Sequence, residues 1–64
     1  MTKKELNNKL SELIIEMGYN AIAEDVKRGY KVKESLQLAL NLFKSEHKNN
    51  PQIERFCQLY LKLL

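Results

Sequence analysis

The sequence contains very few of the residues that usually build chemical sites. Its 64 residues include one cysteine, Cys57, one histidine, His47, and no tryptophan. A single cysteine excludes a disulfide within the chain, and together with one histidine it cannot supply the four ligands of a structural zinc site. His47 has no serine or cysteine partner at a recognisable spacing, and Cys57 lies on an apolar helical stripe where a thiol behaves as a small hydrophobe. We therefore expect no cofactor, no metal and no catalytic residue, and a protein that is not an enzyme.

Long apolar runs are also absent. No stretch approaches the roughly 20 residues that cross a bilayer. The polar opening over residues 1–9 has no apolar segment typical of a secretion signal. We expect a cytoplasmic protein without membrane contact. The net charge of +3 is carried mostly by lysine, and the preference for lysine, asparagine and isoleucine is typical of A/T-rich genomes, which loosely indicates a bacterial or phage source.

Helix breakers are few, and no strand-like alternation occurs. The two glycines, Gly18 and Gly29, and the single proline, Pro51, divide the chain into segments with helical periodicity. This pattern predicts one all-α domain over residues 1–64, a small four-helix bundle made of three helices plus a C-terminal helix. The expected helices cover about residues 3–17, 21–28, 32–48 and 51–64.

Several residues predict where these helices begin and end. Thr2 and Glu5 have the spacing of a capping box at the start of the first helix. The pair Gly-Tyr occurs at 18–19 and again at 29–30, where a left-handed glycine should end a helix. The other expected N-caps are Asn20 and Asn50.

The segment 32–48 has the broadest apolar face of the chain. Leu38 and Leu42 widen its stripe beyond what one packed side needs. We therefore expect this helix to lie in the middle of the bundle, with the others as its covering. In the first helix, Leu6, Leu10, Leu13, Ile14 and Met17 form the expected buried stripe, and Ser11 is expected to face water.

The surplus of apolar residues predicts self-association. A chain of this size folding alone buries only roughly 60% of its unfolded surface, and the last helix is too apolar for the outer layer of a monomer. We therefore expect the bundle to assemble as a homo-oligomer, with a dimer as the simplest form. The expected interface consists of Leu38, Leu42, Phe56, Leu59, Tyr60 and Leu63.

One turn concentrates positive charge. Lysines at the start of the helix over 32–48 are unfavourable for its dipole, and this start lacks a side-chain cap. Free amide groups and lysines together suit a phosphate or carboxylate, although a solvated basic turn explains the same residues. The candidate surface for an anion or an acidic partner consists of Lys27, Arg28, Tyr30, Lys31 and Lys33.

These observations favour a small helical protein that acts by binding another protein, as a regulator, inhibitor or adaptor of the kind that phages encode. A first alternative is a protein that sequesters a small anionic, nucleotide-derived ligand between its subunits. A second is a nucleic-acid-binding module, which the basic balance favours and the lack of clustered arginine opposes.

Overall fold

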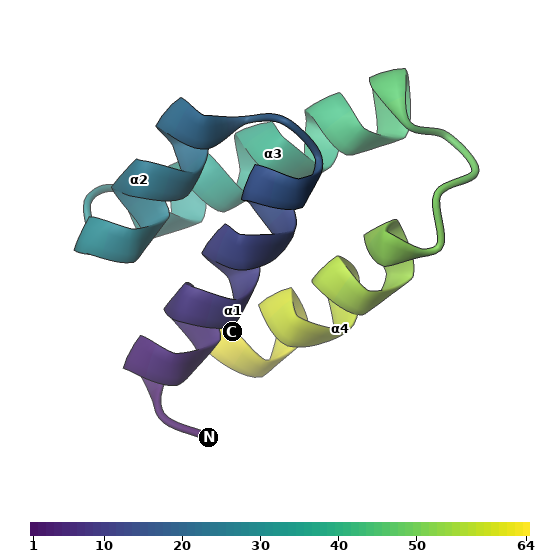
Figure 1. Cartoon of the computed structure of the whole chain (residues 1–64). Helices are drawn as coiled ribbons and strands as arrows, with labels where there is room; N and C mark the ends of the chain where they lie inside the picture. The colour runs from purple at the N-terminus through teal and green to yellow at the C-terminus, as the bar shows by residue number, and fades with distance from the viewer.

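The chain forms four helices and no strand. The computed structural model describes all residues 1–64, with short connections between its helices. The all-α prediction is therefore confirmed. The molecule measures 29 × 21 × 17 Å, and Figure 1 shows α1 between α2 and α4, with α3 running across behind. The helices are α1 (Lys3–Glu16), α2 (Asn20–Arg28), α3 (Val32–Glu46) and α4 (Gln52–Leu63).

The first helix begins at the predicted cap. The Thr2 hydroxyl oxygen accepts a hydrogen bond from the Glu5 amide at 3.2 Å, and the hydroxyl donates to Glu5 Oε1 at the same distance. The carboxylate thus meets the hydroxyl of Thr2. A capping box would instead place it on the backbone amide of Thr2.

Both Gly-Tyr pairs end a helix in the same way. Gly18 has φ 99° and Gly29 has φ 77°, conformations that are costly for residues with a Cβ atom. After α1, the amides of Gly18 and Tyr19 donate to the carbonyls of Ile15 and Ile14. After α2, the amides of Gly29 and Tyr30 donate to the carbonyls of Val26 and Asp25. These paired bonds define the Schellman motif, which satisfies carbonyls that the end of a helix leaves free.

The two asparagines expected as caps behave differently. Asn50 Oδ1 accepts from the Gln52 amide at 2.9 Å, and Pro51 beside it has φ −61°, which suits a helix start. Asn20 is already inside α2, whose start has no side-chain cap at all. The expected Asn20 cap is therefore wrong, because Tyr19, with φ −112° and ψ 66°, takes the N-cap position and Asn20 is the first helical residue.

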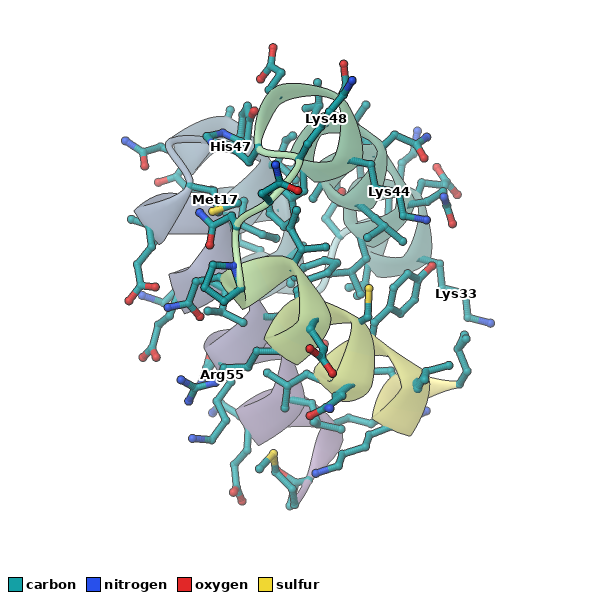
Figure 2. The ribbon with its side chains drawn as sticks, turned by 90° about the vertical axis from the view of Figure 1, so that its right-hand side faces the viewer. Met17, Lys33, Lys44, His47, Lys48 and Arg55 are labelled. Atoms are coloured by element: carbon teal, nitrogen blue, oxygen red, sulfur yellow. The ribbon has the colours of Figure 1, made fainter.

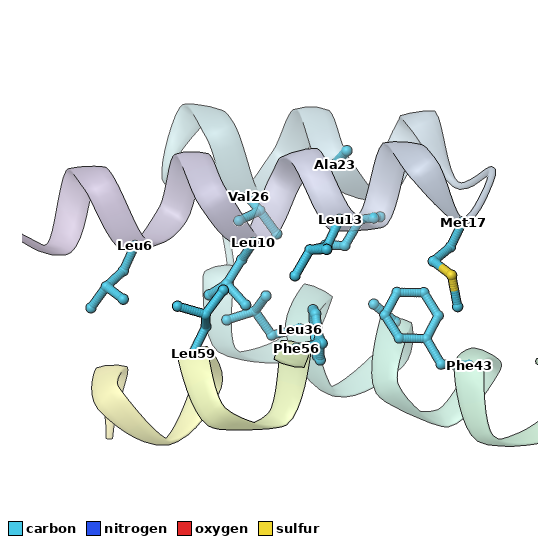
Figure 3. Packing of buried hydrophobic residues seen from close by; sticks show 12 residues of the cluster. Leu6, Leu10, Leu13, Met17, Ala23, Val26, Leu36, Phe43, Phe56 and Leu59 are labelled. Carbon is cyan, nitrogen blue, oxygen red and sulfur yellow. The ribbon is translucent and has the colours of Figure 1, made fainter. Parts of the chain in front are cut away.

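The core is organised around α1, which corrects the expectation that the helix after residue 31 lies in the middle. Five residues of α1 are buried, and Met17 extends the row, whereas α3 buries only three: Leu36, Ala39 and Phe43. Figure 3 shows the leucines of α1 and Met17 directed toward α3 and α4. The extra leucines of α3 lie at the surface: Leu38 is 50% exposed, and Leu42 is half-buried.

Ser11 is a second correction on α1. It was expected to face water, yet only 2% of its surface is exposed. The small hydroxyl donates to the carbonyl of Asn8 at 2.8 Å, so its polar group is satisfied inside the protein. A side chain of this size can therefore lie among the buried residues without an unpaired donor.

Aromatic rings join α3 and α4. Phe43 and Phe56 are fully buried and meet edge to face, with ring centroids 4.9 Å apart at 82°. Tyr60 packs on Phe56 at 6.1 Å, and Tyr19 packs on the other side of Phe43 at 5.8 Å. Edge-to-face pairs of this kind add to the free energy gained by burial. The rings therefore hold α4 firmly against α3 along their inner faces.

Candidate protein-binding groove

An apolar groove lies between α3 and α4 on the outer side of the aromatic pair. It has a volume of about 250 Å³ and is open to solvent. Five of its six lining residues are apolar. They are Leu40 of α3, Cys57, Tyr60 and Leu61 of α4, and Leu64, with Gln37 of α3 as the polar member.

The spacing of α4 explains why this surface is apolar. Phe56 and Leu59 occupy the inward side of the helix and are buried. Cys57, Leu61 and Leu64 follow at i, i+4 and i+7, which places them on one adjacent face. The tips of this face reach far into solvent, since Leu61 is 68% and Leu64 74% exposed.

Tyr60 connects the groove to the core. Its ring is half-buried and lies against the buried ring of Phe56 at an interplanar angle of 67°. Phe56 in turn rests on Phe43. The ring of Tyr60 therefore forms an aromatic floor backed by buried rings, and exposed leucines lie at the edge of the groove. Such a combination of packed aromatic floor and exposed apolar edge suits a hydrophobic anchor from a partner.

The polar side chains of the molecule do not form a reactive cluster. Cys57 is a free, half-buried thiol in the groove. His47 lies elsewhere, edge-on to the ring of Tyr19 at 5.9 Å. No group of three or more histidine, cysteine, aspartate or glutamate side chains could hold a metal ion. None of the helices has both the length and the apolar character needed to cross a membrane.

The structure divides the expected oligomer interface into two groups. Phe56 and Leu59 are 0% and 8% exposed within the single chain, because α4 turns this side toward α1 and α3. They are not available to a partner, which corrects their assignment. Leu38, Leu42, Tyr60 and Leu63 remain at least partly accessible, and of these Tyr60 lines the groove.

Five of the six groove residues were missed as candidates from the sequence, and three of them, Cys57, Leu61 and Leu64, belong to the C-terminal segment. Cys57 was expected on an apolar stripe of the last helix, as a small hydrophobe. The i, i+4, i+7 spacing of these three residues was the available signal. What the spacing could not tell was which of two adjacent apolar faces would point inward.

The basic turn is spread over separate parts of the surface. Lys27 lines a hollow against α1, together with Asn8, Ser11, Glu12 and Ile15. Arg28 forms an ion pair with Asp25, Nη2 to Oδ1, at 2.8 Å. Its guanidinium carbon also lies 5.9 Å from the centroid of the Tyr30 ring. Within this turn, Arg28 thus already has a partner in its own helix.

The start of α3 lies beyond this turn. Lys31 adopts φ 46° and ψ 49°, and the helix start has no side-chain cap, as the sequence indicates. The Lys31 ammonium lies 5.5 Å from the Tyr30 centroid. Lys33 borders a hollow of about 170 Å³ that it shares with Lys3, Asn7, Val32 and Leu63. The five candidate residues thus lie in different hollows and contacts, and the structure does not gather them into one anion-binding surface.

Comparison with family models, with curated proteins and with solved structures finds no match to this chain. The groove and its surroundings are therefore the basis for a functional proposal.

Proposed function

We propose that this chain is a small, non-enzymatic helical protein that acts by binding a polypeptide through the α3–α4 groove. It would serve as a regulator, inhibitor or adaptor of its partner. The observation that carries the proposal is the groove itself, with the half-buried ring of Tyr60 as its floor and its exposed leucine tips. Contiguous exposed apolar surface of this kind marks interaction sites on small soluble proteins.

The shape of the groove favours a polypeptide over a small molecule. Pockets for small molecules are enclosed and hold a few convergent polar groups that fix the ligand. Here the hollow is open, and Gln37 is its only polar lining residue. Protein interfaces instead combine an apolar centre rich in aromatic side chains with a polar rim, and Tyr60 with the neighbouring leucines fits that description.

Native mass spectrometry of the chain purified from its own cells tests this proposal. We expect the wild-type protein to retain a second polypeptide, either another copy or a different chain. Leu61→Glu should lose it, because binding would bury an unpaired carboxylate. The matched control is Ile15→Glu, since Ile15 is 48% exposed on α1, away from the groove. A bare monomer from wild-type cells, or equal loss in both variants, would contradict the proposal.

A further inference from the structure

The groove has one charged residue on each edge near the same end. On α3, Lys44 follows Leu40 by four residues and therefore lies on the groove side of the helix. Figure 2 shows Lys44 and Lys33 on the α3 side of the molecule. On α4, Glu54 precedes Leu61 by seven residues, two full turns, so it shares the outer edge of the groove with Leu61.

Lys44 and Glu54 also lie at nearly the same level along the groove. The two helices run in opposite directions (Figure 1), and Phe43 meets Phe56 across them. Lys44 follows Phe43 by one residue, and Glu54 precedes Phe56 by two. At about 1.5 Å of rise per residue, each lies within roughly 3 Å of that contact along its helix axis.

These two charges are not paired with each other. The only ion pair within 4 Å in the molecule joins Arg28 and Asp25. Lys44 and Glu54 are therefore opposite charges on opposite edges of one apolar groove, and both are exposed.

We propose that the groove is occupied by the same groove of a second copy, packed face to face about a two-fold axis parallel to α3 and α4. This rests on the proposed function and names its partner. Such an axis places α3 of one copy over α4 of the other. Lys44 of each copy then meets Glu54 of the partner subunit, and the ion pair forms twice in one isologous interface.

Charge distinguishes this arrangement from the other symmetric one. A two-fold axis perpendicular to the helices would lay α3 on α3 in opposite directions. Lys44 would then approach Lys33 of the partner subunit, because these lysines mark the two ends of the same side of α3. Like charges placed together across an interface are unfavourable. The parallel axis instead brings together opposite charges around the leucines at 61 and 64, which lose their exposure to water.

Charge exchange between the two positions tests the orientation. We expect the homodimers of Lys44→Glu and of Glu54→Lys each to dissociate about tenfold more readily at low salt, since each then contains two like-charge contacts. Mixing the two variants should restore wild-type affinity, because both contacts in the mixed dimer are again between opposite charges. Sedimentation equilibrium of the separate and mixed proteins measures this directly. Lys62→Glu, on α4, makes the same change of net charge as Lys44→Glu and is its control, so it should leave the dimer unchanged.

The outcomes separate the proposals. If the mixed variants bind no better than each variant alone, the two-fold axis proposed here is wrong. If the isolated wild-type chain is a monomer at all concentrations tested, the second copy is not the occupant. In that case, a different polypeptide retained in native mass spectrometry and lost in Leu61→Glu would leave the proposed function standing.

Cys57 provides an independent readout, because the groove contains the only thiol of the chain. We expect its reaction with a thiol reagent to slow as protein concentration rises through the dimer dissociation constant. In Leu61→Glu the rate should be independent of concentration. A concentration-independent rate in the wild-type protein would overturn the proposed occupancy of the groove.

Discussion

The two Gly-Tyr corners of this protein share their local structure and differ in everything beyond it. Both glycines have positive φ, and both tyrosine amides close the same backbone motif. Tyr19 is half-buried, packs on Phe43 and His47, and its hydroxyl donates a hydrogen bond to the Glu46 carboxylate. Tyr30 is 54% exposed and has only the cations of Arg28 and Lys31 near its ring.

The difference between Tyr19 and Tyr30 shows that the same Gly-Tyr pair can either connect two helices or only end one. The corner after α1 lies beside the end of α3, so its tyrosine joins the first corner of the chain to the third helix. The corner after α2 lies at the rim of the molecule, and no other helix covers its tyrosine. The two residues Gly-Tyr are therefore enough to form the same backbone cap at both corners. The role of the tyrosine side chain depends instead on which helix packs beside it.

The largest difference should appear when each tyrosine is truncated. Tyr19→Ala removes ring contacts with two side chains and a hydrogen bond, and we expect the thermal midpoint to fall by about 10 °C. Tyr30→Ala removes only an exposed ring, and its effect should stay below about 3 °C. Thermal unfolding followed by circular dichroism measures both. Equal shifts would show that the packing of Tyr19 contributes nothing to stability.

The two glycines should instead give similar results. Gly18→Ala and Gly29→Ala each place a Cβ atom on a positive-φ backbone, and we expect each thermal midpoint to fall by about 5 °C. Neither new Cβ would meet an atom within 4 Å, so the cost is conformational in both cases. A much larger loss at Gly18 would mean that the helix ends differ in more than the following tyrosine. Urea denaturation of the two variants provides the second measurement.

A smaller effect of opposite sign is expected at Lys31, which follows the second corner. This residue is the only one besides glycine with positive φ, at 46°. Lys31→Gly should raise the thermal midpoint by about 3 °C, because relief of the left-handed strain exceeds the entropy that glycine adds to the unfolded chain. Lys33→Gly is the control and should destabilise, because Lys33 is inside α3. A lower midpoint for Lys31→Gly would indicate that the contact with Tyr30 outweighs the strain.

The smallest effect concerns alkaline pH. The hydrogen bond to Glu46 raises the pKa of Tyr19 from 10.0 to about 12, with burial and the charge of Glu46 adding to it. A raised pKa means that the folded state favours the neutral phenol. The resulting stabilisation is complete below pH 10 and is lost as pH rises through 12.

Comparison with Tyr19→Phe isolates this contribution, since phenylalanine keeps the ring and removes the titrating group. Urea midpoints measured between pH 9 and 12 should converge for the two proteins as pH rises. Parallel curves for wild type and Tyr19→Phe over that range would contradict the role of the hydrogen bond. Tyr30→Phe serves as the control and should follow the wild type.

Much of the local structure could be predicted from short stretches of sequence. Thr2 with Glu5, the two Gly-Tyr pairs, and Asn50 before Pro51 each act within a few residues, and the structure places a helix end at each. The all-α class followed from the same periodicity. Asn20 was the exception, because α2 begins at Asn20 itself and Tyr19, at the N-cap position, makes no side-chain cap hydrogen bond.

The candidate groove was only partly predictable. The excess of leucine on the last two helices pointed to an exposed apolar surface, and Tyr60 was among the expected interface residues. Phe56 and Leu59 were expected at the oligomer interface, yet both are buried within the single chain. When apolar residues cover most of a helix, more than one face could point inward. The periodicity of the sequence cannot show which of these faces is buried.

Most helix ends thus follow from a few adjacent residues, because caps and turns depend on neighbours in the chain. Packing between helices settles which helix lies at the centre, which tyrosine joins two helices and which face of α4 remains open. These outcomes depend on the competition of several apolar faces for one small core. α1 occupies it with a row from Leu6 to Met17, so Leu40 of α3 and the outer apolar residues of α4 line an open groove, and Leu38 stays at the surface.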